Sequence, residues 1–143
     1  MAEQTNKEQE LLQQRYMELQ MIDAQIKQIQ KQIQLIDNQV NELNFMQESI
    51  EEIKNVEPGT EILVPLSSGI FLKAELKDVN TALVNVGSGV TVEKTMEQTK
   101  ALLAAQQNEL LSYQQDLDAT LAELSVRAGS IEEELKVLVE GRQ

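Results

Sequence analysis

The sequence predicts an α+β protein in which a long antiparallel two-helix coiled coil carries two central β-hairpins. Two observations predict this fold. Apolar residues recur every seven positions in both outer parts of the chain, which is typical of coiled-coil helices. The middle of the chain instead alternates with a period of two, which is typical of strands. We therefore expect coiled-coil helices over residues 1–55 and 95–143, and two hairpins that form an oligomerisation body over residues 58–93.

The first helix is indicated by two apolar rows in a stretch, residues 5–55, that contains neither Pro nor Gly. A helix of this length extends roughly 75 Å, too long for the core of a small globule. One row holds Leu12, Leu19, Ile26, Ile33 and Val40, and the other holds Ile22, Ile29, Ile36, Leu43 and Ile50.

The second helix repeats the pattern with one complete row and one partly polar row. Thr95 and Gln98 have the spacing of a capping box, so the helix is expected to begin there. Because the heptads continue in register through Gly129 and Ser130, we expect no break. The complete row holds Met96, Leu103, Leu110, Leu117, Leu124, Ile131 and Leu138, and the partial row holds Lys100, Gln107, Gln114, Leu121, Ala128 and Leu135.

An antiparallel arrangement predicts which residues of the two helices meet. The favoured register pairs Ile22 with Ala128 and Ile26 with Leu124. A shift by one heptad, which pairs Ile26 with Leu117, is the alternative.

The central segment contains turn residues between apolar strands. Pro58 and Gly59 mark the first turn, and Val84 and Val86 are expected to face Val90 and Val92 across a second hairpin. Pro65 lacks an amide donor, which predicts a strand edge or a bulge at that position.

The glycines of Gly87-Ser88-Gly89 are interpreted as a hairpin turn and not as a nucleotide-binding loop. A phosphate loop needs a Lys followed by Ser or Thr after its last glycine, whereas Gly89 precedes Val-Thr-Val. The sequence also has no Cys and no His, which removes thiol and imidazole chemistry and the usual zinc ligands. We expect no cofactor, no metal site and no enzymatic activity.

The charge and hydropathy of the chain exclude two classes of partner. A formal net charge of −12 repels nucleic acid and acidic membrane surfaces. No apolar run approaches the ~20 residues that span a bilayer, and the N-terminus lacks the apolar segment of a signal peptide. A cytoplasmic protein is expected.

The hairpins are expected to form an oligomer interface, because isolated hairpins have little stability of their own and expose unpaired edges. The candidate interface residues are Ile62, Val64, Ile70, Leu72, Leu76, Val84, Val86, Val90 and Val92.

A second candidate surface lies where the antiparallel model brings the two chain ends together. Apolar residues accumulate there beyond what the seam of the coiled coil needs, which suits the binding of nonnative chains. The alternatives are a locally widened core or scattered surface residues; Leu35, Leu102, Leu111 and Val126 also lie off the seam without explanation. The candidate residues are Leu11, Leu12, Tyr16, Met17, Leu135, Val137, Leu138 and Val139.

The segments "VPLSSGIFLKAEL" (64–76) and "LVNVGSGVTVEKT" (83–95), set between two coiled-coil helices, resemble the prefoldin family. Two hairpins indicate its alpha class, most similar to the archaeal type, because beta-class members carry one. The resemblance implies a hexamer of two alpha-class and four beta-class subunits whose hairpins assemble into a β-barrel body. It also implies an ATP-independent chaperone that captures unfolded proteins at its coiled-coil tips and delivers them to a group II chaperonin.

A structural coiled-coil scaffold or tether with a β-structured oligomerisation head is the alternative function. It shares the architecture, so the discriminating property is whether the assembled protein suppresses aggregation of an unfolded client.

Overall fold

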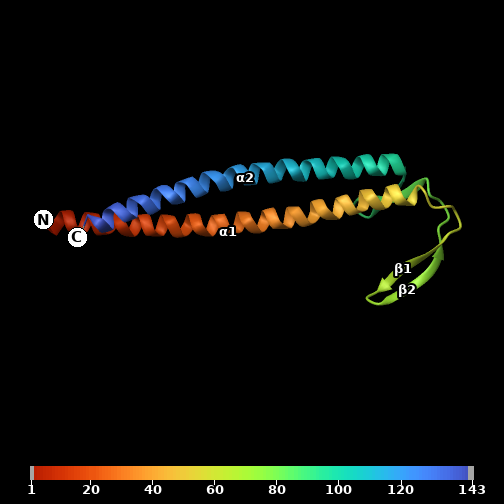
Figure 1. Ribbon diagram of the computed structural model, residues 1–143, viewed down its shortest axis with the longest axis horizontal. Coiled ribbons are helices and arrows are strands. Elements are labelled where there is room, and N and C mark those ends of the chain that lie inside the picture. Colours follow the sequence, from red (N-terminus) through yellow and green to blue (C-terminus); the bar gives the residue numbers. More distant parts are fainter. Residues whose placement is uncertain (1, 142–143) are drawn as a thin grey trace. The chain divides into compact units, whose positions relative to one another are not determined.

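The computed structural model describes residues 2–141, which form two long helices and two β-hairpins (Figure 1). Helix α1 spans Ala2–Ile53 and helix α2 spans Met96–Glu140. Between them lie β1 (Glu61–Ser67), β2 (Ile70–Glu75), β3 (Thr81–Gly87) and β4 (Val90–Thr95). The predicted α+β fold class is confirmed.

The chain divides into two compact units that we describe separately. The coiled-coil unit comprises the described parts of residues 1–38 and 111–143, and the hairpin unit comprises residues 39–110.

The coiled-coil unit is held together by an apolar core between α1 and α2. Ile22, Ala128, Ile131 and Leu135 are buried to between 4 and 8% exposure. Early residues of α1 thus pack against late residues of α2, as an antiparallel pair requires. Ile22 and Ala128 belong to this cluster. The contacts of Arg15 with Glu134 and of Gln114 with Asp37 join positions that the favoured register places side by side. The half-buried residues packed against the core are Leu12, Leu19, Ile26 and Leu124.

The seam of the hairpin unit differs, because polar side chains of α2 occupy it. Gln107 donates from Nε2 to Oδ1 of Asn44 and accepts at Oε1 from Nε2 of Gln47, the latter at 3.1 Å. Lys100 forms an ion pair with Glu51. These contacts replace the apolar layers that the partly polar row cannot supply.

Helix α2 begins with the predicted capping box. The backbone N–H of Gln98 donates to Oγ1 of Thr95 at 3.0 Å, and the N–H of Thr95 donates to Oε1 of Gln98 at 3.1 Å. These two bonds satisfy donors that the first helical turn leaves without a partner. The helix then continues through Gly129 and Ser130 without interruption, as the unbroken heptads predicted.

The first hairpin contains the irregularity expected at Pro65. Strands β1 and β2 are antiparallel, with Val64 opposite Leu72 and Pro65 opposite Phe71, and the register shifts between Pro65 and Ser67. A shift here is favourable because Pro cannot donate to the ladder.

The second hairpin places Val84 opposite Val92, as expected. Val86 falls within a register shift between Asn85 and Gly87, so it is not directly opposite Val90. At the turn Ser88 and Gly89 have φ of 52° and 74°, which identifies the glycine-rich segment as a hairpin loop. The N–H of Gly87 donates to Oδ1 of Asn85 at 2.9 Å and supports the turn.

The connection between the hairpins is fixed by Asp78. Its carboxylate accepts from the hydroxyl of Thr81 and, at 2.8 Å, from the N–H of Asn80. The pKa of Asp78 is lowered, chiefly by the Thr81 hydroxyl and then by the Asn80 amide. The N–H of Met96 in turn donates to the carbonyl of Asn80 at 2.9 Å and ties this connection to the start of α2.

Candidate binding surfaces

Five apolar side chains are exposed where the N-terminal turns of α1 lie beside the C-terminal turns of α2 (Figure 1). None of them is needed to fill the seam. We call these residues the end surface: Leu11, Tyr16, Met17, Val137 and Val139, with exposed fractions of 38, 48, 63, 61 and 45%.

The other three candidates at this end belong to the helix seam. Leu135 is 6% exposed and is part of the buried core. Leu12 packs against that core, and Leu138 is half-buried. All three lie in the heptad rows, so their position in the repeat could have separated them from the end surface.

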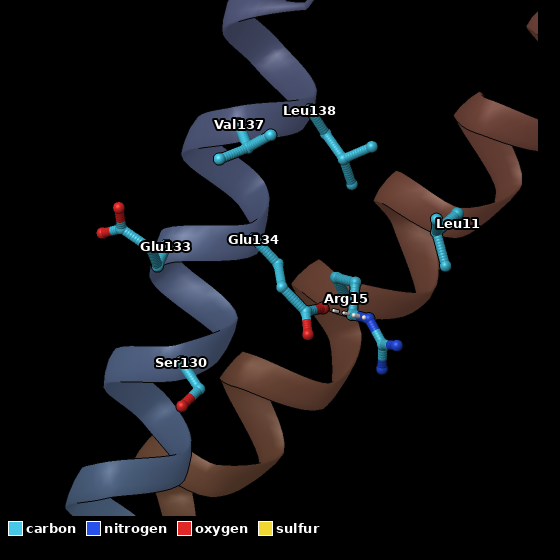
Figure 2. A pocket seen from close by; sticks show the side chains of 7 residues that line it. All are labelled: Leu11, Arg15, Ser130, Glu133, Glu134, Val137 and Leu138. Atoms are coloured by element: carbon cyan, nitrogen blue, oxygen red, sulfur yellow. Dashed lines mark ion pairs between the residues drawn. The ribbon is translucent and has the colours of Figure 1, made fainter.

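A groove crosses the coiled-coil unit at this end and includes part of the end surface (Figure 2). It has a volume of about 550 Å³, and in Figure 2 the side chain of Leu138 points toward α1. We call it the end groove; it is lined by Leu11, Arg15, Ser130, Glu133, Glu134, Val137 and Leu138.

The polar lining residues of the end groove were not among the candidates predicted from the sequence. Arg15 lies four residues after Leu11, and Glu133 lies four residues before Val137, so each pair shares a helix face. That spacing, applied from the apolar candidates, would have identified both positions.

An ion-pair network connects α1 and α2 beside the end groove. Nε of Arg15 lies 2.7 Å from Oε2 of Glu134, in a geometry that makes an ion pair but not a hydrogen bond. Glu18 accepts from Arg127 Nη2 at 2.6 Å and from Arg15 Nη1 at 2.8 Å. The Arg127 guanidinium, followed by that of Arg15, holds the pKa of Glu18 below its ordinary value.

The hairpins expose apolar side chains on the face that carries the candidate interface residues. On this face Val64 and Leu72 are 42 and 53% exposed, while Ile62 and Val84 are half-buried. The other candidates are Ile70, Val86, Val90 and Val92, which are exposed, and Leu76, which is half-buried.

The opposite, mostly polar faces of the hairpins also expose single apolar side chains, which were not among the candidates predicted from the sequence. Leu63, Phe71 and Leu83 are 62, 55 and 76% exposed. A two-stranded hairpin has no core of its own, so the more apolar face, which carries Val64, Leu72 and Val92, needs a surface to pack against.

Two negative findings apply to residues 2–141. No cluster of three or more Asp or Glu side chains in this range has a geometry that could hold a metal ion. No helix in the same range combines the length and apolar character needed to cross a membrane.

Comparison with known proteins finds similarity along most of the chain. The family model described as Prefoldin, prefoldin subunit, matches residues 22–141. The prefoldin subunit alpha of Pyrococcus horikoshii is 33% identical over 129 residues, which cover 90% of this chain and 85% of the relative. Prefoldin subunit alpha 1 of Thermococcus kodakarensis is 37% identical over 97 residues, which cover 68% of this chain and 64% of the relative.

A solved structure shares the fold at low sequence identity. It is described as the cryo-EM structure of filamentous PFD from Methanocaldococcus jannaschii, and its TM-score with this chain is 0.75. The match is 20% identical and covers 83% of this chain and 98% of that chain. The likeness supports the arrangement of long helices and hairpins.

Proposed function

Since this chain belongs to the prefoldin family of chaperones, we propose that its end surface captures unfolded proteins without ATP. Family membership makes the chain a chaperone subunit, and its relatives are alpha subunits. The alternative of a purely structural scaffold or tether is not favoured.

The observation that carries the proposal is the exposure of the end surface beside a fully occupied seam. Leu135 and Ile131 already fill the core, so Val137 and Val139 remain available to a client. Burial of apolar area contributes roughly 25 cal/mol per Å², and the loss of freedom on association cancels much of it. One end surface therefore binds weakly.

Assembly through the hairpins would convert weak contacts into useful binding. We propose that the hairpins join those of beta-class subunits in a β-barrel body, in a hexamer of two alpha-class and four beta-class subunits. Supporting this, both hairpins are two-stranded and expose apolar side chains such as Leu72 and Val92. Several end surfaces on one body raise the effective concentration at a single client.

The remaining features of the proposal follow from the family. We propose that the complex passes its client to a group II chaperonin in the cytoplasm and that the chain catalyses no reaction. The hairpin loop at Gly87–Gly89 supports independence from ATP, because it occupies the one segment that resembled a phosphate loop.

The test is suppression of aggregation by the complex of this chain with its beta-class partner. The variant Y16Q/M17Q/V137Q/V139Q removes exposed apolar surface without touching the seam. The control L35Q/L111Q/Y113Q/V126Q makes four matched changes in the same unit at positions 38 to 72% exposed. We expect the first variant to lose most holdase activity and the control to retain it, with or without ATP.

Equal activity of the two variants would contradict the assignment. Circular dichroism and sedimentation of both complexes establish that each variant still folds and assembles.

A further inference from the structure

We propose that the end groove selects client segments in which Lys or Arg flanks an apolar side chain. This inference rests on the proposed function and names the class of client. Two features of the groove carry it. One end is apolar and is formed by Leu11, Val137 and Leu138. Beside it lie the carboxylates of Glu133 and Glu140, which form no ion pair with any residue among 2–141.

The α2 side of the groove carries a net negative charge, because Lys136 is the one cation between Glu133 and Glu140. Glu133 lies four residues before Val137, and Glu140 lies three residues after it, so both are one helical turn from that side chain. Figure 2 shows the Glu133 carboxylate on the side of α2 away from α1, at the outer rim. Glu134 is different, because Arg15 pairs with it.

The α1 side of the groove is close to neutral. Lys7 and Glu8 lie one turn before Leu11, and their charges are opposite. Arg15, one turn after Leu11, is already engaged by Glu134 and Glu18. The charge that a client meets beside the apolar end is therefore negative and comes from α2.

This arrangement favours a basic client for a physical reason. An unfolded segment that places an apolar side chain over Val137 brings its neighbouring residues to the rim. Lys and Arg at those neighbours meet Glu133 or Glu140, whereas Asp and Glu are repelled. The formal net charge of −12 also attracts basic segments at longer range.

The size of the effect is modest because the rim is exposed to solvent. Each exposed pair of opposite charges favours binding by roughly two- to fivefold, and added salt weakens it. The preference is thus a bias among unfolded clients and not a strict requirement.

The test compares two fluorescent peptides that share one apolar core and carry either lysines or glutamates at both ends. Binding to the assembled complex is followed by fluorescence anisotropy at low and high salt. Only this chain is varied, so that any difference arises from its own end groove. The variant is E133Q/E140Q, and the matched control is E123Q/E132Q, which removes the same charge from two exposed positions of the same helix outside the groove lining.

We expect the wild-type complex to bind the lysine peptide severalfold more tightly, and E133Q/E140Q to reduce that ratio by roughly two- to fivefold. The control should keep the wild-type ratio. An unchanged ratio in E133Q/E140Q, or an equal loss in the control, overturns the inference.

The proposed function has a separate outcome in the same experiment. If Y16Q/M17Q/V137Q/V139Q binds both peptides as tightly as the wild type does, the end surface is not the capture site and both proposals fail. If that variant loses both peptides while the charge ratio is insensitive to Glu133 and Glu140, only the client preference fails.

Discussion

Arg127 on α2 donates from Nη2 to Oε1 of Glu18 on α1 at 2.6 Å, across 109 positions of sequence. The same carboxylate also accepts from Arg15, which in turn pairs with Glu134 of α2. Arg127 is 64% exposed, so these ion pairs contribute little free energy. The two pairs that join α1 to α2 do distinguish one helix register from another, because a shift of one heptad would separate Arg127 from Glu18 and Arg15 from Glu134.

The first prediction concerns that register. Cysteines placed at Ile26 and Leu124 should form a disulfide within one chain under mild oxidation, because both side chains pack on the same core cluster. The control pair, Ile26 and Leu117, should not crosslink. Non-reducing gels with mass spectrometry distinguish the two products, and a dominant 26–117 bridge would establish the shifted register.

The second prediction is a pH dependence centred on Glu18. Its pKa is lower in the folded chain than the ordinary value of 4.5, which the unfolded chain retains. The ionised carboxylate therefore stabilises the fold at pH above 4.5, and this contribution disappears as the pH falls through the lowered value. The variant E18Q should melt below the wild type at pH 7.

The difference in melting temperature between wild type and E18Q should shrink as the pH falls below 4.5. Circular dichroism from pH 7 to 3, with E132Q as a control at an exposed glutamate, measures it. A difference that stays constant with pH would exclude the ion-pair explanation.

The third prediction concerns the core of the coiled-coil unit. Ile131 is 4% exposed, so Ile131→Ala should lower the free energy of unfolding by about 2 to 5 kcal/mol through lost burial and a residual cavity. Val126, on the same helix, is 72% exposed, and Val126→Ala should change the free energy of unfolding by roughly 0.5 kcal/mol or less. Guanidinium unfolding at one fixed protein concentration compares them.

The elements of this fold were predictable because their signals are local. The heptad rows, the Thr95–Gln98 capping box and the turn glycines each specify structure over a few neighbouring residues. The bulge at Pro65 follows from one missing donor.

The cross-helix ion pairs and the exposure of the hairpins were not predictable from local signals. Arg15 meets Glu134 only once the register between two distant segments is fixed. The apolar character of Leu63 and Phe71 was visible in the sequence, but their exposure on the second face depends on what covers the hairpin. The exposed Leu35 and Val126 still have no explanation from the structure.

The fourth prediction tests the hairpins as an assembly surface. Val84 and Asn85 are adjacent in β3 and project to opposite faces, with Val92 and Thr91 as their respective partners. Val84→Asp should place a charge in the apolar interface and dissociate the complex, while the helices stay formed. Asn85→Asp adds the same charge on the other face and should leave assembly intact.

Analytical ultracentrifugation of the complex measures both variants, and far-ultraviolet circular dichroism reports the helices. A stable, well-behaved monomer formed by the unmodified chain alone would contradict the assembly role of the hairpins.

The last prediction concerns the polar seam, where Gln107 contacts Asn44 and Gln47, and Gln114 donates to Asp37. Polar residues at seam positions fix register and lower stability. Replacing both glutamines of α2 with Leu buries more apolar surface, which should stabilise the folded chain by roughly 1 to 2 kcal/mol per site. The hydrogen bonds that are removed cost less free energy than this, because Asn44 and Asp37, their partners on α1, lie near solvent and can bind water instead.

We therefore expect Q107L/Q114L to raise the melting temperature and to relax the register. In the cysteine assay, the single 26–124 product should become a mixture with 26–117, because Leu packs acceptably in either alignment. The matched control L103A/L110A, in the complete apolar row, should lower the melting temperature without producing that mixture. A single crosslinked product in Q107L/Q114L would show that the apolar rows and the ion pairs fix the register without the two glutamines.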